Sequence, residues 1–320
     1  AGAARHRADL LRAVAVTAAA AGAEARGRAA EAVAAVAPRS PGFEERFRVA
    51  RACGALRDAR LAPVLGRLLA APEPEVREAA ASAAADLPAT AAGPLLRRAL
   101  KDASPEVRRA AVTGLGRRRD VALEADVADA LTTDRWPLVR REAATALAER
   151  CSGAASLTPL RRATADADRE VARTALRALV ACRDPQAGKI LLAVLGDPKR
   201  PALLRETAAG ALGTLGDRSL APELARLLDE VRTEPGTDDR GESLAVTLAR
   251  ALGRVGDERA LPSLRQASVD PASARLRAAA LEAIAAICPS GATKVFKEAE
   301  ADKDPRVVGA ARAAQSRCRR

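Results

Sequence analysis

Few side chains in this sequence are suited to catalysis. The chain has one histidine, His6, and the rest of its 320 residues cannot supply a His-based triad, a multi-histidine metal site or an HExxH motif. The five cysteines form no CxxC pair and are odd in number, so neither a zinc cage nor a complete disulfide framework is predicted. No Gly-rich phosphate loop is present. We therefore expect no catalytic residue, no bound metal and no cofactor.

Charge offers a different kind of chemistry. The sequence has 53 basic and 41 acidic residues, a formal net charge of +12, and only six of the basic residues are lysine. The excess is spread along the chain rather than gathered in a tail. Two interpretations remain open: the solvated helix faces of an Arg-rich sequence, or a surface for phosphates or acidic proteins.

The composition indicates which elements position these charges. Only 1% of the residues are aromatic, whereas 48% are hydrophobic, mostly Ala, Leu and Val. Ala and Leu are strong helix formers, and small side chains let helices approach closely. Many thin helical layers suit this composition better than one thick core. No run of 18 apolar residues occurs, so we expect no membrane-spanning helix.

A recurring phrase supports a layered array. An apolar residue followed by Arg opens an Ala-rich segment at Val76, and its equivalents begin at Val107, Val139, Val171, Leu204, Leu244, Leu276 and Val307. The intervals are 31, 32, 32, 33, 40, 32 and 31 residues. Apolar positions within a copy fall at i, i+4 and i+8, which marks one face of an α-helix. A period this regular predicts a repeat protein.

A second phrase precedes the first in each unit. Gly216-Asp217 followed by Pro222 recurs as Gly256-Asp257 followed by Pro262. Gly suits a helix C-cap, and Pro is tolerated near the start of the next helix because its missing N–H would be unpaired there. Each unit is therefore predicted to be a helix, a short turn, a second helix and a turn.

These residues resemble HEAT repeats, in particular the bacterial group named for its occurrence in phycobilin lyases. The resemblance implies an all-α fold, a right-handed α-solenoid of about nine helix pairs, with a leading or capping helix in residues 1–23. The solenoid would occupy 24–320, and we expect units at about 24–57, 59–87, 90–118, 121–150, 155–182, 186–215, 219–255, 259–287 and 291–318.

In HEAT families an Asp in the turn and the Arg opening the second helix form a ladder between neighbouring units. The matching pairs here are Asp102 with Arg108 and Asp134 with Arg140, and less regularly Asp270 with Arg277. The resemblance therefore gives these residues a structural role. We expect the ladder to be interrupted where the Arg is replaced, at Ala172, Ala245 and Val308.

The resemblance also bears on enzyme classes. HEAT-like deoxyhypusine hydroxylases need several His-Glu pairs for two irons, and this chain cannot supply them. Related DNA glycosylases use aromatic side chains in a cleft, and aromatics are nearly absent here. No short motif defines the bilin lyases, so a lyase-like enzyme or chromophore chaperone stays open as an alternative.

Second helices line the concave side of HEAT solenoids, which places their exposed positions in columns. One such column contains Arg109, Arg141 and Arg173, with Glu78 before and Glu206 after them. At a layer spacing of about 10 Å, the three Arg side chains would span roughly 20 Å. The two further residues assigned to this basic surface are Arg117 and Arg177. Chance alignment in an Arg-rich chain is the alternative.

Two further features of the sequence, a tryptophan and an acidic insertion, can each be interpreted in two ways. Trp136 is a candidate anchor for a partner, or a plug between two repeats. Residues 229–243 contain an acidic insertion, which we expect to be a flexible solvated loop, with a functional loop as the alternative.

The cysteines favour a reducing compartment. Cys151 and Cys182 lie one repeat apart, and an interaxial distance of about 8–10 Å keeps most such pairs beyond disulfide reach. We read them as small buried hydrophobes and expect a cytoplasmic protein. Basic residues followed by small apolar ones from Arg5 to Ala23 leave export to the cell envelope, after signal removal, as the alternative.

These observations favour a non-catalytic scaffold that binds an acidic protein on its concave face. A module that binds the phosphate backbone of nucleic acid is the first alternative. The chain is expected to be a monomer without a membrane span.

Overall fold

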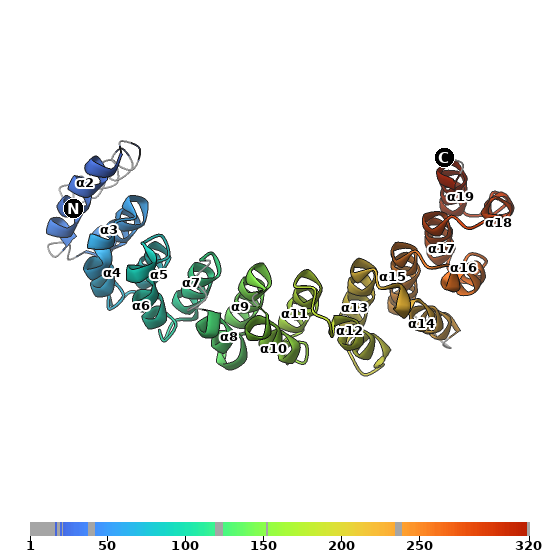
Figure 1. Ribbon diagram of the computed structural model, residues 1–320, viewed down its shortest axis with the longest axis horizontal. Helices are drawn as coiled ribbons and strands as arrows, with labels where there is room; N and C mark the ends of the chain where they lie inside the picture. The colour runs from blue at the N-terminus through green and yellow to red at the C-terminus, as the bar shows by residue number, and fades with distance from the viewer. Residues whose placement is uncertain are drawn as a thin grey trace. The chain divides into compact units, whose positions relative to one another are not determined.

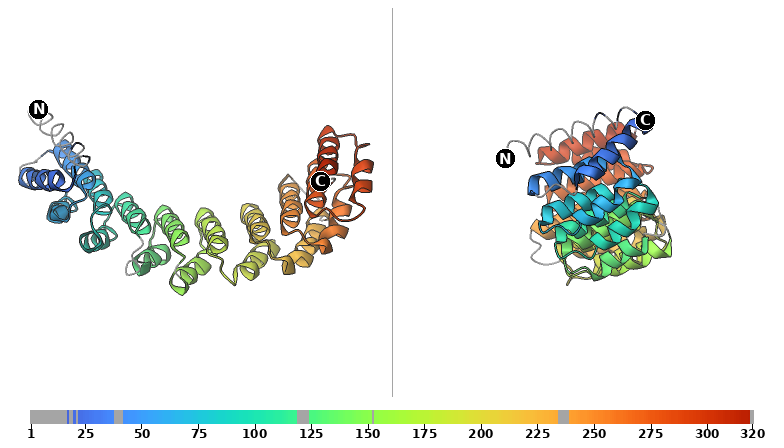
Figure 2. Two further views of the ribbon diagram at one scale, coloured as in Figure 1. Left: turned by 45° about the horizontal axis from the view of Figure 1, so that its top comes forward. Right: turned by 90° about the vertical axis from the view of Figure 1, so that its left-hand side faces the viewer.

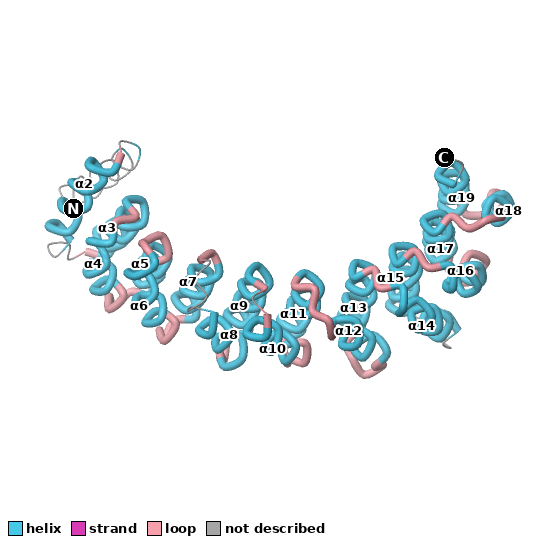
Figure 3. Tube along the Cα trace, viewed as in Figure 1, coloured by secondary structure: helices cyan, strands magenta, loops and turns pink. Residues whose placement is uncertain are grey.

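The computed structural model describes residues 17, 20, 22–37, 42–118, 124–151, 153–233 and 239–318. Within these ranges the secondary structure is helical and contains no strand, as Figure 3 shows, which confirms the all-α prediction. His6 and almost all of the predicted leading helix lie outside the described residues. The chain separates into two compact units, residues 1–175 and 176–320, which are described in turn. The finer division into nine repeats stays a prediction.

The first unit is a series of helix pairs (Figure 1). Its helices are α2 (Ala23–Val36), α3 (Phe43–Leu56), α4 (Ala62–Leu68), α5 (Pro74–Ala84), α6 (Ala89–Ala99), α7 (Pro105–Gly116), α8 (Glu124–Thr133), α9 (Pro137–Arg150), α10 (Ala154–Ala163) and the start of α11 (Arg169–Ala181). The second helices α3, α5, α7 and α9 pack one on the next and form one row, while α4, α6, α8 and α10 form the other.

The second unit repeats this arrangement. It contains the end of α11, then α12 (Ala187–Gly196), α13 (Ala202–Leu215), α14 (Ala221–Thr233), α15 (Asp239–Val255), α16 (Leu261–Ala267), α17 (Ala274–Ile287), α18 (Ala292–Ala299) and α19 (Pro305–Cys318). The second helices α13, α15, α17 and α19 pack in succession, and each also packs on its own first helix. The views in Figure 2 show the paired helices of each unit side by side.

Local sequence explains where the second helices begin and end. Pro74, Pro105 and Pro137 occupy the first turn of α5, α7 and α9, where a missing N–H costs nothing. Gly216 ends α13 with φ of 67°, the left-handed conformation that glycine adopts without a Cβ penalty. The predicted glycine cap is therefore confirmed at this position.

The apolar residues of the recurring phrase form the core. Val76, Val107 and Val139 are completely buried in the first unit, and Leu204 and Leu276 are at most 3% exposed in the second. Small residues bring the second helices close together. A Cβ added to Gly116 of α7 would lie 3.2 Å from the Cα of Ala146 on α9, so glycine permits this approach.

The acidic insertion is shorter than the sequence suggests. Helix α14 continues to Thr233, and α15 begins at Asp239, so most of the predicted loop 229–243 is helical. The reason is that Leu228 and Val231, three residues apart, are both buried and extend the apolar face of α14. Residues 234–238 lie outside the described residues.

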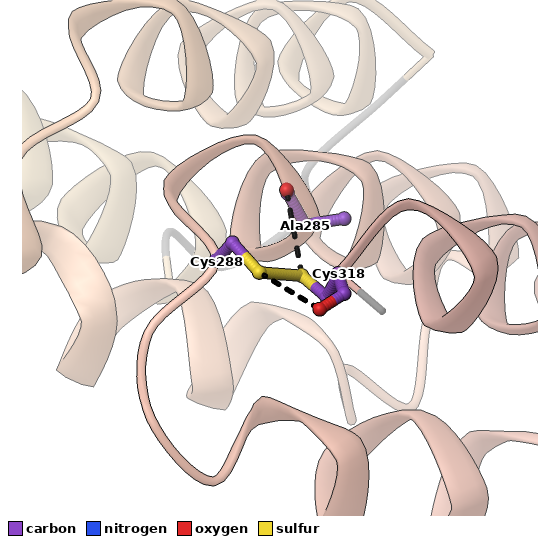
Figure 4. The surroundings of a disulfide bond; sticks show 3 residues. All are labelled: Ala285, Cys288 and Cys318. Carbon is purple, nitrogen blue, oxygen red and sulfur yellow. Dashed lines mark hydrogen bonds between the residues drawn. A yellow bond between two sulfur atoms is a disulfide. The ribbon is translucent and has the colours of Figure 1, made fainter. Parts of the chain in front are cut away.

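The prediction that Cys151 and Cys182 are unpaired is wrong, and the sequence indicated no disulfide at Cys288 and Cys318 either. Cys288 and Cys318 form a disulfide with a Cα–Cα distance of 5.6 Å (Figure 4). Cys151 and Cys182 are also disulfide-bonded, whereas Cys53 is a free, buried thiol. Cys288 is the C-cap of α17 in the left-handed conformation, and this turn brings it to the last turn of α19. Cys151 likewise ends α9 in the left-handed conformation, and the interaxial distance used in the prediction for Cys151 and Cys182 does not apply at such a helix end.

Candidate partner-binding surface

An ordered ladder of ion pairs holds the turns of the first unit. Arg77 donates Nε and Nη2 to the Asp102 carboxylate at 2.8 and 2.9 Å, and Arg108 makes the same fork on Asp134 at 2.7 and 3.0 Å. Arg140 binds Asp166 with two bonds of 2.8 Å. Bidentate pairs of this kind fix both side chains in one geometry. The ladder arginines are therefore committed to the structure.

The pairing differs in register from the sequence prediction. Arg108 reaches Asp102 only through its backbone carbonyl, at 2.9 Å, and gives its two-bond fork to Asp134 of the following turn. Arg140 likewise contacts the carbonyl of Asp134 and the carboxylate of Asp166. Each arginine thus bonds its own turn through the backbone and the next turn through a carboxylate.

The aspartates of the ladder are held in their charged form. Burial by itself raises the pKa of Asp134, but hydrogen bonds from Arg108 and from the Trp136 N–H outweigh it, and the pKa lies below its ordinary value. The same opposition lowers the pKa of Asp102, bonded by Arg77, and of Asp166, bonded by Arg140. All three aspartates therefore remain ionised at neutral pH.

The second unit has a less regular ladder. Arg277 makes the bidentate contact with Asp302 at 2.7 and 2.9 Å, and its Nη1 donates to the Asp270 carbonyl. Arg205 donates instead to the backbone carbonyl of Leu195 at 2.9 Å. Ala245 stands at the equivalent position of α15, and here Arg232 of α14 approaches the Asp270 carboxylate to 3.7 Å.

Each arginine of the predicted basic column directly follows a ladder position in the sequence. Arg109 lies 3.5 Å from Glu78, with side chains 41% and 35% exposed, and Arg173 lies 2.5 Å from Glu170, with side chains 30% and 31% exposed. Arg141 of α9 is exposed and makes no ion pair within the described part of the chain. The three residues belong to the first unit, and Arg141 is the one whose charge is not shared with a carboxylate.

The other two predicted binding residues lie elsewhere. Arg117 is the C-cap residue of α7 and is exposed. Arg177 is also exposed, but it belongs to the second unit, where it borders a cavity of about 430 Å³ with Glu206 and Arg254. The structure thus does not gather all five arginines on one unit.

Trp136 does not fill a gap between repeats. Its side chain is 47% exposed, and its backbone N–H donates to Asp134 at 2.9 Å as the N-cap residue of α9. Two residues later, Leu138 is 41% exposed, and sequence reasoning missed it. The signal was available, because the equivalent position in the neighbouring repeats is a glutamate, at Glu75, Glu106 and Glu170.

The sequence also gave no sign of a groove at the start of the first unit. This groove of about 900 Å³ has a basic side, with Arg51 and Arg57 of α3, and an acidic side, with Glu75, Glu78 and Asp86 of α5 and its end. Its opposite charges are close to balance, unlike those of the column around Arg141.

The described residues contain no cluster of three or more His, Cys, Asp or Glu side chains able to hold a metal ion. Burial raises the pKa of the Cys53 thiol to about 12, so this cysteine is not a thiolate at neutral pH. Among the helices that the structure describes, none has both the length and the apolar character needed to cross a membrane.

Comparison with known protein families shows which type of repeat these helix pairs are. The family model for HEAT repeats matches residues 92–168 and 157–235, and the model for the PBS lyase HEAT-like repeat matches 244–270. No curated protein sequence matches the chain. The matched segments lie between residue 92 of the first unit and residue 270 of the second.

Solved structures support the same architecture. Kap121p aligns with a TM-score of 0.56 at 16% identity over 95% of this chain and 40% of its own. Kap121p bound to Pho4p aligns with a TM-score of 0.53 at 17% identity over 97% and 36%. Human deoxyhypusine hydroxylase in complex with glycerol aligns with a TM-score of only 0.36 at 20% identity over 82% and 96%. At these identities the likeness extends to the fold alone.

Proposed function

Since this chain is a HEAT-repeat protein, we propose that it is a non-catalytic scaffold that binds an acidic protein partner through Arg109, Arg141 and Arg173. A solenoid of this kind is typical of protein-interaction scaffolds, and each repeat offers one or two exposed side chains to a shared surface. The proposal concerns the second helices α7, α9 and α11 of the first unit.

One observation carries this assignment. Consecutive arginines have different surroundings. Arg108 and Arg140 are bound to aspartates of the next turn. Arg109 and Arg141 extend from the same helices toward solvent. The fold therefore uses the first arginine of each pair in the ladder and leaves the second outside it, Arg109 beside Glu78 and Arg141 without an ion pair in the described residues. An exposed guanidinium matches a carboxylate in two parallel hydrogen bonds, which favours an acidic protein surface.

A protein partner is favoured over nucleic acid by the neighbouring carboxylates. Glu78 lies beside Arg109 and Glu170 beside Arg173, and a continuous phosphate backbone would meet these negative charges along the column. A protein can instead place carboxylates only where the arginines are. Structural similarity to Kap121p, which was solved bound to Pho4p, adds a fold-level analogy for protein binding.

The test compares two triple charge reversals. In one variant Arg109, Arg141 and Arg173 are changed to Glu, and in the matched control the exposed first-helix residues Arg67, Arg162 and Arg265 are changed to Glu. The net charge is the same in both. Proteins captured by the wild type from nuclease-treated lysate are identified by mass spectrometry, purified, and titrated against all three forms.

We expect the column variant to lose at least tenfold in affinity for the captured acidic protein, while the control stays within about twofold. Circular dichroism should show the same helix content in all forms. Equal binding by the two variants would remove the site assignment. Capture that occurs from an untreated lysate but not from the nuclease-treated one, and that falls steeply with salt, would establish the nucleic-acid alternative. A coloured adduct with a bilin and an acceptor protein would contradict the non-catalytic assignment.

A further inference from the structure

Three neighbouring second helices differ at one exposed position. In α11, Glu170 lies three residues before Arg173 and pairs with it at 2.5 Å. In α7, Glu106 lies three residues before Arg109, and the charge of Arg109 contributes, after the hydrogen bond from Ser104, to a lowered pKa of Glu106. In α9 the equivalent residue is Leu138. Residues i and i+3 are neighbours on a helix, so Leu138 replaces the carboxylate that Arg141 would otherwise meet.

This replacement has two effects at the same place. It leaves Arg141 without an ion pair in the described structure, and it puts a large apolar side chain in solvent. Trp136, at the N-cap of the same helix, adds a second one. The described residues contain four exposed large hydrophobics, namely Phe43, Trp136, Leu138 and Val269, so two of the four fall within three residues at the start of α9. Single exposed apolar residues are ordinary, but such a cluster beside an unpaired charge points to a ligand.

We propose that Trp136, Leu138 and Arg141, here named the α9 triad, recognise an amphipathic acidic helix of the partner protein. Its matching feature would be a large apolar side chain and a carboxylate about one helical turn apart, the apolar group on Trp136 and Leu138 and the carboxylate on Arg141. This inference rests on the proposed function and names the chemistry of its partner. Aromatic residues and arginine dominate binding energy in protein interfaces, and the triad contains both.

Charge complementarity distinguishes Arg141 from its neighbours in the column. A partner carboxylate must compete with Glu78 for Arg109 and with Glu170 for Arg173, but no such competition exists at Arg141. An apolar contact beside it also excludes water from the new pair, which strengthens the pair. The α9 triad would therefore set where along the column the partner helix docks.

The chain provides its own probe for this site. Trp136 is its one tryptophan, and it has no tyrosine, so fluorescence excited at the indole band reports on the triad alone. Three synthetic helical peptides of equal length are titrated into the full chain. The first carries Leu and Glu one turn apart, the second has Ser in place of Leu, and the third has Gln in place of Glu. Anisotropy of a dye on each peptide measures binding independently of Trp136.

The first peptide should bind at least tenfold more tightly than either of the others, shift the Trp136 emission to the blue and protect it from acrylamide. The variant Leu138→Glu should weaken that peptide at least tenfold, because it removes the apolar contact and supplies Arg141 with the same i, i+3 partner that Arg173 has. Arg141→Gln should abolish the preference for Glu over Gln. The control Val269→Glu, at a residue 74% exposed, should change nothing.

The possible failures are separable from failure of the proposed function. If the Leu and Ser peptides bind equally and Trp136 does not respond, acidic binding stands and the α9 triad is overturned. Undiminished binding by Leu138→Glu also overturns it, as does the absence of binding by every peptide. A Trp136 shift that depends on protein concentration without peptide would show that a second copy of the chain covers the triad, which again overturns the proposal. Capture of the purified acidic partner judges the scaffold function independently.

Discussion

The two compact units build the same helix pairs but reinforce them differently. In the first unit Arg77, Arg108 and Arg140 each fork onto an aspartate of the following turn. Among the described residues of the second unit one such fork is present, Arg277 on Asp302, and a disulfide joins Cys288 to Cys318. The comparison shows that the fold does not need a ladder arginine at every repeat, since α15 keeps its place with Ala245 at the ladder position. It also shows where charge is concentrated: the first unit has both the ladder and the basic column.

The largest expected difference between the units concerns the ladder arginines. Arg108→Ala leaves the Asp134 carboxylate, whose side chain is 9% exposed, without its bidentate partner, and should cost about 3–5 kcal/mol of unfolding free energy. Arg205→Ala loses a hydrogen bond to a backbone carbonyl and should cost about 1 kcal/mol. Urea unfolding followed by amide hydrogen exchange assigns each loss to its unit. Equal costs would show that the ladder adds nothing to the first unit beyond ordinary hydrogen bonding.

Alanine substitutions at two glycines of the second unit should change the free energy of unfolding by smaller amounts, in opposite directions. A Cβ at Gly253 of α15 would lie 2.7 Å from the Cα of Ala283 on α17, so Gly253→Ala should destabilise by about 1–3 kcal/mol. A Cβ at Gly210 of α13 meets nothing within 4 Å, so Gly210→Ala should stabilise by about 0.5–1 kcal/mol. Thermal unfolding of the two variants measures both signs. A neutral Gly253→Ala would mean that α15 and α17 separate without cost.

The smallest expected difference is in acid sensitivity, since three forked aspartates with lowered pKa values lie in the first unit and one, Asp302, lies in the described part of the second. The folded-state pKa values of Asp102, Asp134 and Asp166 lie below the ordinary 3.8, so the unfolded chain binds protons first as the pH falls. Their stabilising contribution is complete above that range and is lost as the pH drops below 3.8 through the lowered values. Hydrogen exchange should show acid loss of protection in the first unit, and Asp134→Asn should make that loss shallower. An unchanged acid profile in Asp134→Asn would contradict the lowered pKa.

The repeat was predictable because the apolar period is carried by residues such as Val107 and Val139, whose burial is independent of partners. Which aspartate each ladder arginine binds could not be predicted. Asp134 lies between Arg108 and Arg140 in the sequence, and its spacing to either arginine fits one contact, so only the geometry of the turn decides which receives the carboxylate. The prediction that Cys151 and Cys182 are unpaired failed for a related reason, since Cys151 lies in a left-handed turn at the end of α9, where the distance between helix axes does not apply.

For the candidate site, the sequence located the arginines but not their availability. Whether these arginines carry an unshared charge depends on nearby carboxylates, Glu170 three residues before Arg173 and Glu78 on the helix before Arg109, which the column of arginines by itself does not reveal. Leu138 became informative only beside Glu106 and Glu170. Exposure of Trp136 depends on the turn that Asp134 organises through the Trp136 N–H, and no propensity of tryptophan predicts it.

The double attachment of each ladder arginine has a mechanical consequence. Arg108 bonds the carbonyl of its own turn and the carboxylate of the next, so a sliding displacement between these repeats must stretch a guanidinium held at both ends. This link resists sliding of α7 against α9 along one edge. The small residues Gly116 and Ala146, where the two helices meet, add little resistance to that sliding. The first unit should therefore resist sliding between its repeats along the ladder edge, and the stretch from α13 to α15, where Arg205 and Ala245 make no such fork, should be more compliant.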